Sequence, residues 1–353
     1  MKTKKFIYLA LFMGFFLFLF PIHSMADEEN LGYTVSAILN GKQIDPEKSY
    51  FYIQTTPGEQ QELAVTIKST TEEPAKVKVY VEDAFTGNKG TVEYTTDKKL
   101  LDSTLTEPMS SLVTVETPTV TVEKFGASEA KFTLTPPNGN YSGVKMGTLV
   151  FELDNSEEEG GVGTKFAYRI GIVTSETGED YDTSQTLNLL DAKSMLLRGK
   201  KMILATLQNP EPKVLSKLAI TAELKNKANE TVMKKEQVEN YALAPNSNFD
   251  FEMDWGTSDI KAGTYVLTLV AQNSYNDWKF EKEFIITGEQ AKSMNTQSGF
   301  KIVTPMWIKV MAIICLIFMV VVTGLLLVRR KKMEVEWERR RKRKKRKKKK
   351  EGK

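Results

Sequence analysis

Apolar and polar residues alternate in many short stretches of this chain. In ELAVTIK, the apolar residues Leu63, Val65 and Ile67 occupy every second position, and KVKVYVE at residues 76–82 repeats the arrangement. A period of two places such side chains on one face of a β-strand, so one face of each stretch is suited to a core.

Turn-forming residues separate these stretches, as in Gly87-Asn88 and the PPNG run at 136–139, and residues 27–175 show no long helical periodicity. Short strands at this spacing favour a β-sandwich over alternating strands and helices. Similar stretches resume after residue 186, as in KMILATLQN and GTYVLTLVAQN. The pattern therefore predicts an all-β fold with two Ig-like β-sandwich domains.

The stretch NSNFDFEMDW at residues 246–255 is a strand with two different faces. Its acidic residues alternate with its apolar ones. The acids are Asp250, Glu252 and Asp254, and the apolar residues are Phe249, Phe251, Met253 and Trp255. The apolar row predicts a core position, while the acidic row is either a solvated face or a surface that attracts a basic partner.

Two long apolar segments place most of the chain outside a membrane. MKTKK followed by FIYLALFMGFFLFLF and the small residues of SMA has the form of a secretory signal peptide, with cleavage expected between Ala26 and Asp27. Residues 307–328 include a run without charged side chains that is long enough to cross a bilayer as one α-helix. The basic tail that follows indicates a cytoplasmic end, so we expect a single-pass type I protein whose residues 27–306 lie at the cell wall.

The net charge of +4 conceals an uneven distribution. The tail 329–353 has 17 basic and 4 acidic residues, and three lysines precede Ala26, so the remaining residues together are net −12. A basic run beside a membrane span is typical of a topology signal that contacts anionic lipid, and we expect no nucleic-acid binding.

Composition excludes several kinds of chemistry from the mature protein. The single histidine of the full chain is His23, within the signal peptide, so the mature protein would have none. The single cysteine is Cys315, within the span. Without imidazole, the usual zinc sites and the Ser-His and Cys-His nucleophiles are absent, and no phosphate-binding glycine loop occurs. We expect no cofactor, no metal site and no enzyme activity, although the acidic segments 154–161 and 180–184 leave calcium binding open.

The polar stretch SETGEDYDTSQ separates the two strand-rich halves, and we interpret its core as a linker. The expected organisation is 1–26 signal peptide, 27–175 first sandwich, 176–185 linker, 186–295 second sandwich, 296–306 stalk, 307–328 transmembrane helix and 329–353 cytoplasmic tail.

Both halves resemble one family of surface proteins. LAPNSNFDFEMDW followed by IKAGTYVLTLVAQNSYNDWKFEKEFIIT resembles the C-terminal domain of WxL-interacting proteins of low-GC Gram-positive bacteria. YFYIQTTPGEQQELAVTIKSTTEEPAKVKVYVEDAFTGNKGTVEY resembles their N-terminal domain, and the resemblance covers residues 31–295, the span and the tail. One departure is LNGKQ, which stands where the family has Pro-x-Asn-Gln. The chain has no Trp-x-Leu motif, so it resembles the companion of WxL proteins and not a WxL protein itself.

The resemblance implies a binding function. It assigns peptidoglycan binding to the first domain, and binding of host matrix proteins or a WxL-domain surface protein to the second. We therefore expect a membrane-anchored surface scaffold. Its candidate partner-binding residues are Asp250, Glu252, Asp254, Tyr141 and Tyr275.

Two other functions stay open from the sequence. An assembly or secretion factor could act on surface proteins by strand donation, because sandwich edges can pair with another chain. A cell-wall glycan hydrolase could use two paired carboxylates, which any acidic protein can supply.

Overall fold

The computed structural model describes residues 32–154, 166–301 and 305–351, with side-chain burial up to residue 342. The expected cleavage site at Ala26 and Asp27 lies outside the described residues, as does most of the acidic segment 154–161. The chain forms two compact units, the first of which holds most of both β-sandwiches. The second consists of residues 196–201, 255–261 and 289 onward.

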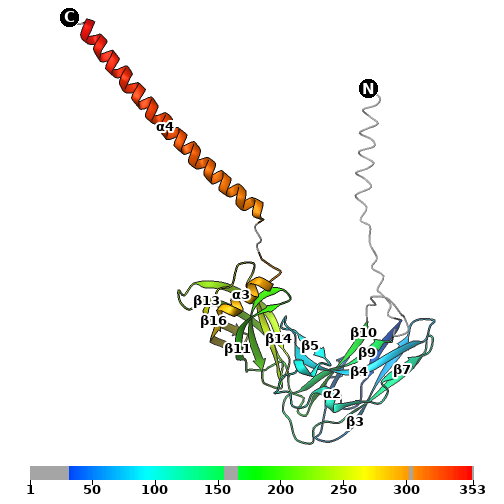
Figure 1. The fold of residues 1–353 in the computed structure, drawn as a ribbon. Helices are drawn as coiled ribbons and strands as arrows, with labels where there is room; N and C mark the ends of the chain where they lie inside the picture. The colour runs from blue at the N-terminus through cyan, green and yellow to red at the C-terminus, as the bar shows by residue number, and fades with distance from the viewer. Residues whose placement is uncertain (1–31, 155–165, 302–304, 352–353) are drawn as a thin grey trace, which may run out of the picture. The chain divides into compact units, whose positions relative to one another are not determined.

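The first sandwich packs a four-stranded sheet against a six-stranded one. Its strands are the blue to green ribbons of Figure 1. The strand order of the smaller sheet is β1 (Tyr33–Ile38), β3 (Gln61–Ser69), β8 (Ala127–Leu134) and β6 (Val113–Val115). The order of the larger is β2 (Phe51–Gln54), β10 (Ala167–Ser175), β9 (Lys145–Leu153), β4 (Ala75–Thr86) and β5 (Val92–Thr95), with β7 (Thr119–Val122) also paired to β4. Two short helical turns complete it, η1 (Lys98–Leu100) and α2 (Met109–Leu112).

Alternation along the strands builds the core of the first sandwich, as the sequence predicts. Val65 and Ile67 are fully buried, and Val77 on the facing sheet is equally buried. Phe132 and Phe151 meet edge to face with their ring centroids 6.2 Å apart, which is a favoured arrangement of aromatic pairs.

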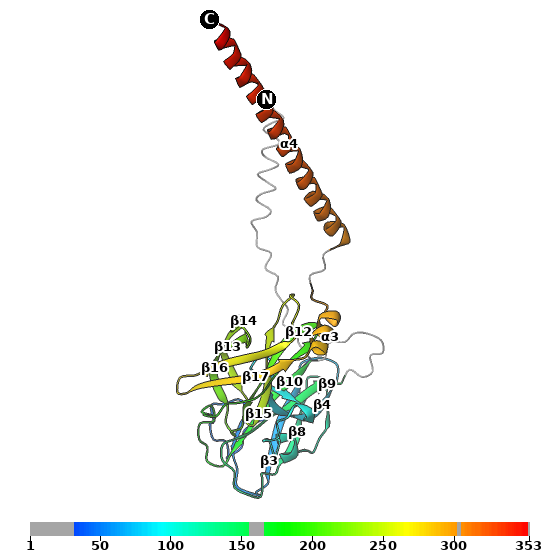
Figure 2. The same cartoon turned by 60° about the vertical axis from the view of Figure 1, so that its left-hand side comes forward.

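The second sandwich has three strands facing four. The three-stranded sheet has the order β11 (Asn188–Leu197), β12 (Lys200–Asn209) and β15 (Ser247–Asp254). The four-stranded sheet has the order β14 (Val232–Leu243), β13 (Leu215–Asn226), β16 (Gly263–Gln272) and β17 (Asp277–Ile286). In Figure 2, β13, β16 and β17 lie side by side.

β15 confirms the predicted division of the NSNFDFEMDW stretch. Phe249, Phe251 and Met253 are at most 4% exposed. On the opposite edge strand β17, Trp278 and Phe280 are half-buried on the face they share with Lys282. The Lys282 Nζ donates to the carbonyl oxygen of Leu190 at 3.2 Å, so this inward charge is satisfied by β11. Both sandwiches therefore have the all-β architecture expected from the sequence.

The chain ends in two helices, α3 (Gly288–Gln297) and α4 (Met306–Glu351). Within the described residues, α4 is the one helix that is long and apolar enough to cross a membrane, and the predicted span 307–328 lies inside it. Its apolar side chains are open to the surroundings, with Phe318 67% and Leu325 65% exposed. Since the described protein covers none of these side chains, a bilayer is the environment that suits them. Figure 1 shows that the basic tail continues the same helix.

Candidate binding surfaces

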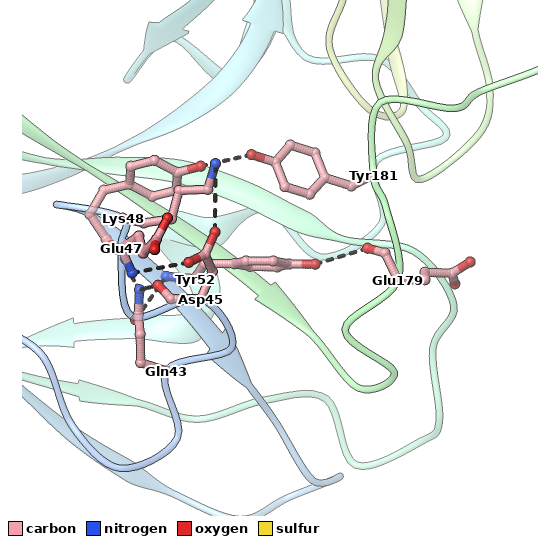
Figure 3. A network of polar contacts seen from close by, with 8 residues as sticks. Gln43, Asp45, Glu47, Lys48, Tyr52, Glu179 and Tyr181 are labelled. Atoms are coloured by element: carbon pink, nitrogen blue, oxygen red, sulfur yellow. Dashed lines mark hydrogen bonds and ion pairs between the residues drawn. The ribbon is translucent and has the colours of Figure 1, made fainter.

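A single glutamine organises the loop that joins β1 to β2 (Figure 3). The Gln43 Nε2 donates to the carbonyl oxygens of Asp45 and Tyr50, each at 2.9 Å, and its Oε1 accepts from the Tyr52 N–H at 3.1 Å. These bonds satisfy three backbone groups, two of them in the loop and one in β2 (Phe51–Gln54). The LNGKQ segment thus departs from the family pattern while its glutamine fixes the conformation of the loop.

Tyrosines from this loop, from β2 and from the segment after β10 meet on the outer side of the larger sheet of the first sandwich. There Tyr50, Tyr52 and Tyr181, which we call the tyrosine cluster, pack with Met146 and Val173. Of the three, Tyr50 also packs against the main core. The rings of Tyr52 and Tyr181 meet edge to face at 5.4 Å. The hydroxyls of Tyr50 and Tyr181 lie 2.9 Å apart, and the Tyr52 hydroxyl donates to the carbonyl oxygen of Glu179 at 2.9 Å. Burial raises the pKa of Tyr52, and burial together with the Tyr50 hydrogen bond raises that of Tyr181, so both stay protonated at neutral pH.

Charged side chains surround the tyrosine cluster. The Lys48 Nζ lies 5.8 Å from the centre of the Tyr50 ring and 3.9 Å from Asp45. Further along the same sheet, the Arg169 Nε donates to Glu82 at 3.0 Å, and this hydrogen bond raises the pKa of the guanidinium. This side of the first sandwich therefore combines aromatic rings with groups that can donate or accept hydrogen bonds.

The acidic row of β15 is half-buried and hydrogen-bonded within the protein. The Asp250 Oδ1 accepts from the Thr206 hydroxyl at 2.6 Å, and Glu252 accepts from the Asn88 Nδ2 at 2.9 Å. Asp254 pairs in register with Met202 of β12. Because Asn88 belongs to the turn between β4 and β5, part of the row faces the first sandwich.

The two candidate tyrosines lie in different places. The Tyr141 hydroxyl contacts the hydroxyls of Thr55 and Thr174 at 2.7 and 3.0 Å in the first sandwich. Tyr275 is 43% exposed, and its hydroxyl donates to the carbonyl oxygens of Asp182 and Ser184. The structure does not bring either tyrosine next to the acidic row of β15 through any contact of the described residues.

The segment 176–185 is held from both sandwiches. Besides the contacts of Tyr52 and Tyr275, Lys213 forms an ion pair with Glu179 at 2.7 Å. The Val214 N–H donates to the carbonyl oxygen of Tyr181, and the Ser184 N–H donates back to Val214. The connection between the sandwiches is consequently ordered by many backbone bonds.

A buried carboxylate links the two sandwiches. Asp102 lies between η1 and α2 and is 5% exposed. It accepts two 3.0 Å bonds from the Gln208 Nε2 of β12, one bond from the Asn248 Nδ2 of β15, and two bonds from Thr104 of its own loop. Burial would raise the pKa of Asp102, but the hydrogen bonds from Asn248, Thr104 and Gln208 outweigh it and hold the pKa below its ordinary value.

A second set of bonds lies beside this carboxylate. The Thr86 and Ser247 hydroxyls are 2.6 Å apart, and the Ala244 N–H donates to the Thr86 Oγ1 at 2.9 Å. The Ala242 N–H donates to the carbonyl oxygen of Gly90 at 2.7 Å. We call these contacts, together with those of Asp102, the junction. Nothing in the sequence pattern pointed to it, because its partners are far apart in the chain.

In the part of the chain that the structure describes, no three His, Cys, Asp or Glu side chains are grouped to hold a metal ion. This holds for the acidic segment 180–184, where the sequence left calcium binding open.

Comparison with solved structures finds distant similarity to periplasmic chaperones and related domains. The YadV chaperone is 11% identical, with 72% of this chain and 100% of that chain covered and a TM-score of 0.30. The CupB2 chaperone of Pseudomonas aeruginosa is 13% identical, covering 63% and 91%, with a TM-score of 0.27. The PapD-like domain 7 of human CEP192 is 14% identical, covering 41% and 84%, with a TM-score of 0.25. No curated protein matches the chain.

Two family models match, and both describe WxL-interacting proteins. The model of the peptidoglycan binding domain matches residues 33–153, and the model of the host binding domain matches residues 157–296. The boundary between the matches precedes β10, which pairs with β2 and β9 and so belongs to the first sandwich. With both domain models in the order expected from its sequence, the chain belongs to the WxL-interacting protein family.

Proposed function

We propose that the chain is a non-enzymatic, membrane-anchored surface protein that binds peptidoglycan through its first sandwich and a protein partner through its second. The observation that carries this proposal is the pair of domain matches, whose descriptions name peptidoglycan binding and host binding. The protein partner is a WxL-domain surface protein, which the family name implies, or a host matrix protein.

The proposed anchor is α4. Its apolar part supplies the span, and the basic tail beyond residue 328 supplies a cytoplasmic end by the positive-inside rule. The two sandwiches then lie outside the membrane, within reach of the cell wall of a Gram-positive bacterium. A scaffold in this position would hold its partner close to the wall.

A binding assay with the full chain in lipid nanodiscs tests the function. The nanodiscs are mixed with purified peptidoglycan and sedimented, and a purified WxL-domain protein is offered to the same nanodiscs on an affinity support. Nanodiscs without protein are the control. We expect the protein to sediment with peptidoglycan and to retain the WxL-domain protein. Failure to bind either ligand would contradict the proposal.

A further inference from the structure

We propose that the tyrosine cluster is the surface that binds the glycan strand of peptidoglycan. This inference rests on the proposed function, and it goes further by assigning one component of the ligand, the sugar chain, to named residues. The first sandwich therefore recognises the glycan strand and not the stem peptides.

The first observation is that three tyrosines gather in a small cluster on the outer side of the larger sheet, and that Tyr50 connects this cluster to the main core. Tyr52 and Val173 are 6% and 4% exposed, whereas Tyr50 and Tyr181 are only half-buried. The main core of this sandwich forms without Tyr181, which comes from the segment after β10. Half-buried tyrosines present both an apolar ring face and a polar tip, and these match the C–H faces and hydroxyls of a sugar.

The second observation is the state of the hydroxyl groups. In the 2.9 Å pair of Tyr50 and Tyr181, one hydroxyl donates and the other accepts, so the accepting hydroxyl keeps its own proton to donate. The Tyr52 hydroxyl differs because its proton is used by the Glu179 carbonyl oxygen. The Tyr50–Tyr181 pair can thus offer one donor and free lone pairs to a sugar hydroxyl.

The third observation is that the surface is preorganised. The three bonds of Gln43 fix the backbone on either side of Tyr50, and the Asp45 carboxylate accepts from the Glu47 N–H at 3.0 Å. Figure 3 shows this network of loop residues next to Tyr181 and Glu179. A site that is rigid before binding loses less entropy when a flexible polysaccharide docks on it. The neighbouring Lys48 and Asp45 add polar groups of both signs for hydroxyl and amide groups.

The competing explanation is that the tyrosines only hold the segment 176–185 in place. Ser216 of β13 provides a control for that role, since its hydroxyl also contacts this segment but from the second sandwich, donating to the carbonyl oxygen of Asp182 at 3.0 Å. A variant that merely loosens the segment should behave like Ser216→Ala. A variant that removes a sugar contact should weaken binding further.

The experiment uses the full chain in nanodiscs and two probes, intact peptidoglycan and glycan strands freed of stem peptides by an amidase. We expect Tyr50→Ala and Tyr181→Ala each to weaken binding to both probes by about tenfold, which corresponds to about 1.4 kcal/mol. Ser216→Ala should bind like the unmodified protein. The double variant Tyr50→Phe/Tyr181→Phe keeps the rings but loses the hydroxyl pair, and we expect about threefold weaker binding because one hydrogen bond is lost.

The outcomes separate the two proposals. If the unmodified protein fails to bind intact peptidoglycan, the proposed function is wrong. If it binds intact peptidoglycan but not the freed glycan strands, the stem peptide is the ligand and the inference is overturned. The inference is also overturned if the phenylalanine double variant, which retains the packing, and the alanine variants bind both probes as tightly as the unmodified protein.

Discussion

Replacing Asp102 by alanine is expected to uncouple the two sandwiches. The carboxylate is 5% exposed and receives hydrogen bonds from Gln208 and Asn248, which lie on two strands of the second sandwich. Alanine removes the acceptor and leaves both amide groups with unsatisfied donors. Gln208 is only 9% exposed, so water replaces the lost partner poorly.

The size of the effect follows from the number of bonds lost across the junction. A hydrogen bond to a charged group contributes about 1.5–3 kcal/mol, and two amide side chains lose theirs, so the coupling free energy should fall by about 3–6 kcal/mol. Asp102→Asn retains one acceptor oxygen but places an amide group against the donor groups of Gln208 and Asn248. It should therefore lose roughly half as much coupling free energy. The remaining junction bonds, such as that between Thr86 and Ser247, are unchanged.

Urea unfolding of the full chain in nanodiscs measures this coupling. We expect one cooperative transition for the unmodified protein and two separated transitions for Asp102→Ala, because the sandwiches no longer stabilise each other. The control is Asp97→Ala in the same loop region. The Asp97 side chain is exposed and caps η1 by accepting from the Lys99 N–H at 3.0 Å, so its loss should cost about 1 kcal/mol without splitting the transition.

The pH dependence gives an independent check. Because the folded-state pKa of Asp102 is lowered, its contribution to stability is fully present above the ordinary aspartate pKa of about 3.9. The contribution is lost as pH falls through the lower pKa of the folded state. The unmodified protein should therefore lose its coupling in acid, and Asp102→Asn should show a weaker acid dependence. A single, unshifted transition in Asp102→Ala would refute the reasoning.

Three further predictions concern substitutions at single residues. Gly90→Ala should weaken the junction, because the residue has a φ of +63° and an added Cβ would come within 1.9 Å of the Tyr241 ring. We expect a lower midpoint of urea unfolding, and an unchanged midpoint would contradict this prediction. Tyr33→Phe should cost about 1 kcal/mol, because the buried Tyr33 hydroxyl donates to the carbonyl oxygen of Phe151 at 2.7 Å. Burial raises the pKa of Tyr33 to about 12, so its contribution is full below pH 10 and is lost as pH rises through about 12, which alkaline unfolding of both proteins would test. For topology, a cysteine at the exposed Ser142 should react with a membrane-impermeant maleimide in intact cells, whereas labelling only after lysis would overturn the proposed orientation.

The strands and the span were predictable because each has a local, periodic signal. Val65 and Ile67 are buried by alternation, and the apolar row of β15 is buried for the same reason. Alternation assigns a side chain to a face, but it does not say what covers that face. This is why the environment of Asp250 and Glu252 stayed open until the structure showed Thr206 and Asn88 beside them.

The junction and the hydrogen bonds of Gln43 have no periodic signal, and this explains why the sequence could not reveal them. Asp102 meets Gln208 and Asn248 across 106 and 146 residues of chain, and no spacing rule connects such positions. Gln43 acts over at most nine residues, yet its role depends on the path of a loop that lacks regular structure. Both are polar side chains that serve several partners at once, so each substitution leaves more than one buried group unsatisfied. Their loss should therefore be more damaging than that of a surface acid, and a comparison of Asp102→Ala with Asp97→Ala measures the difference directly.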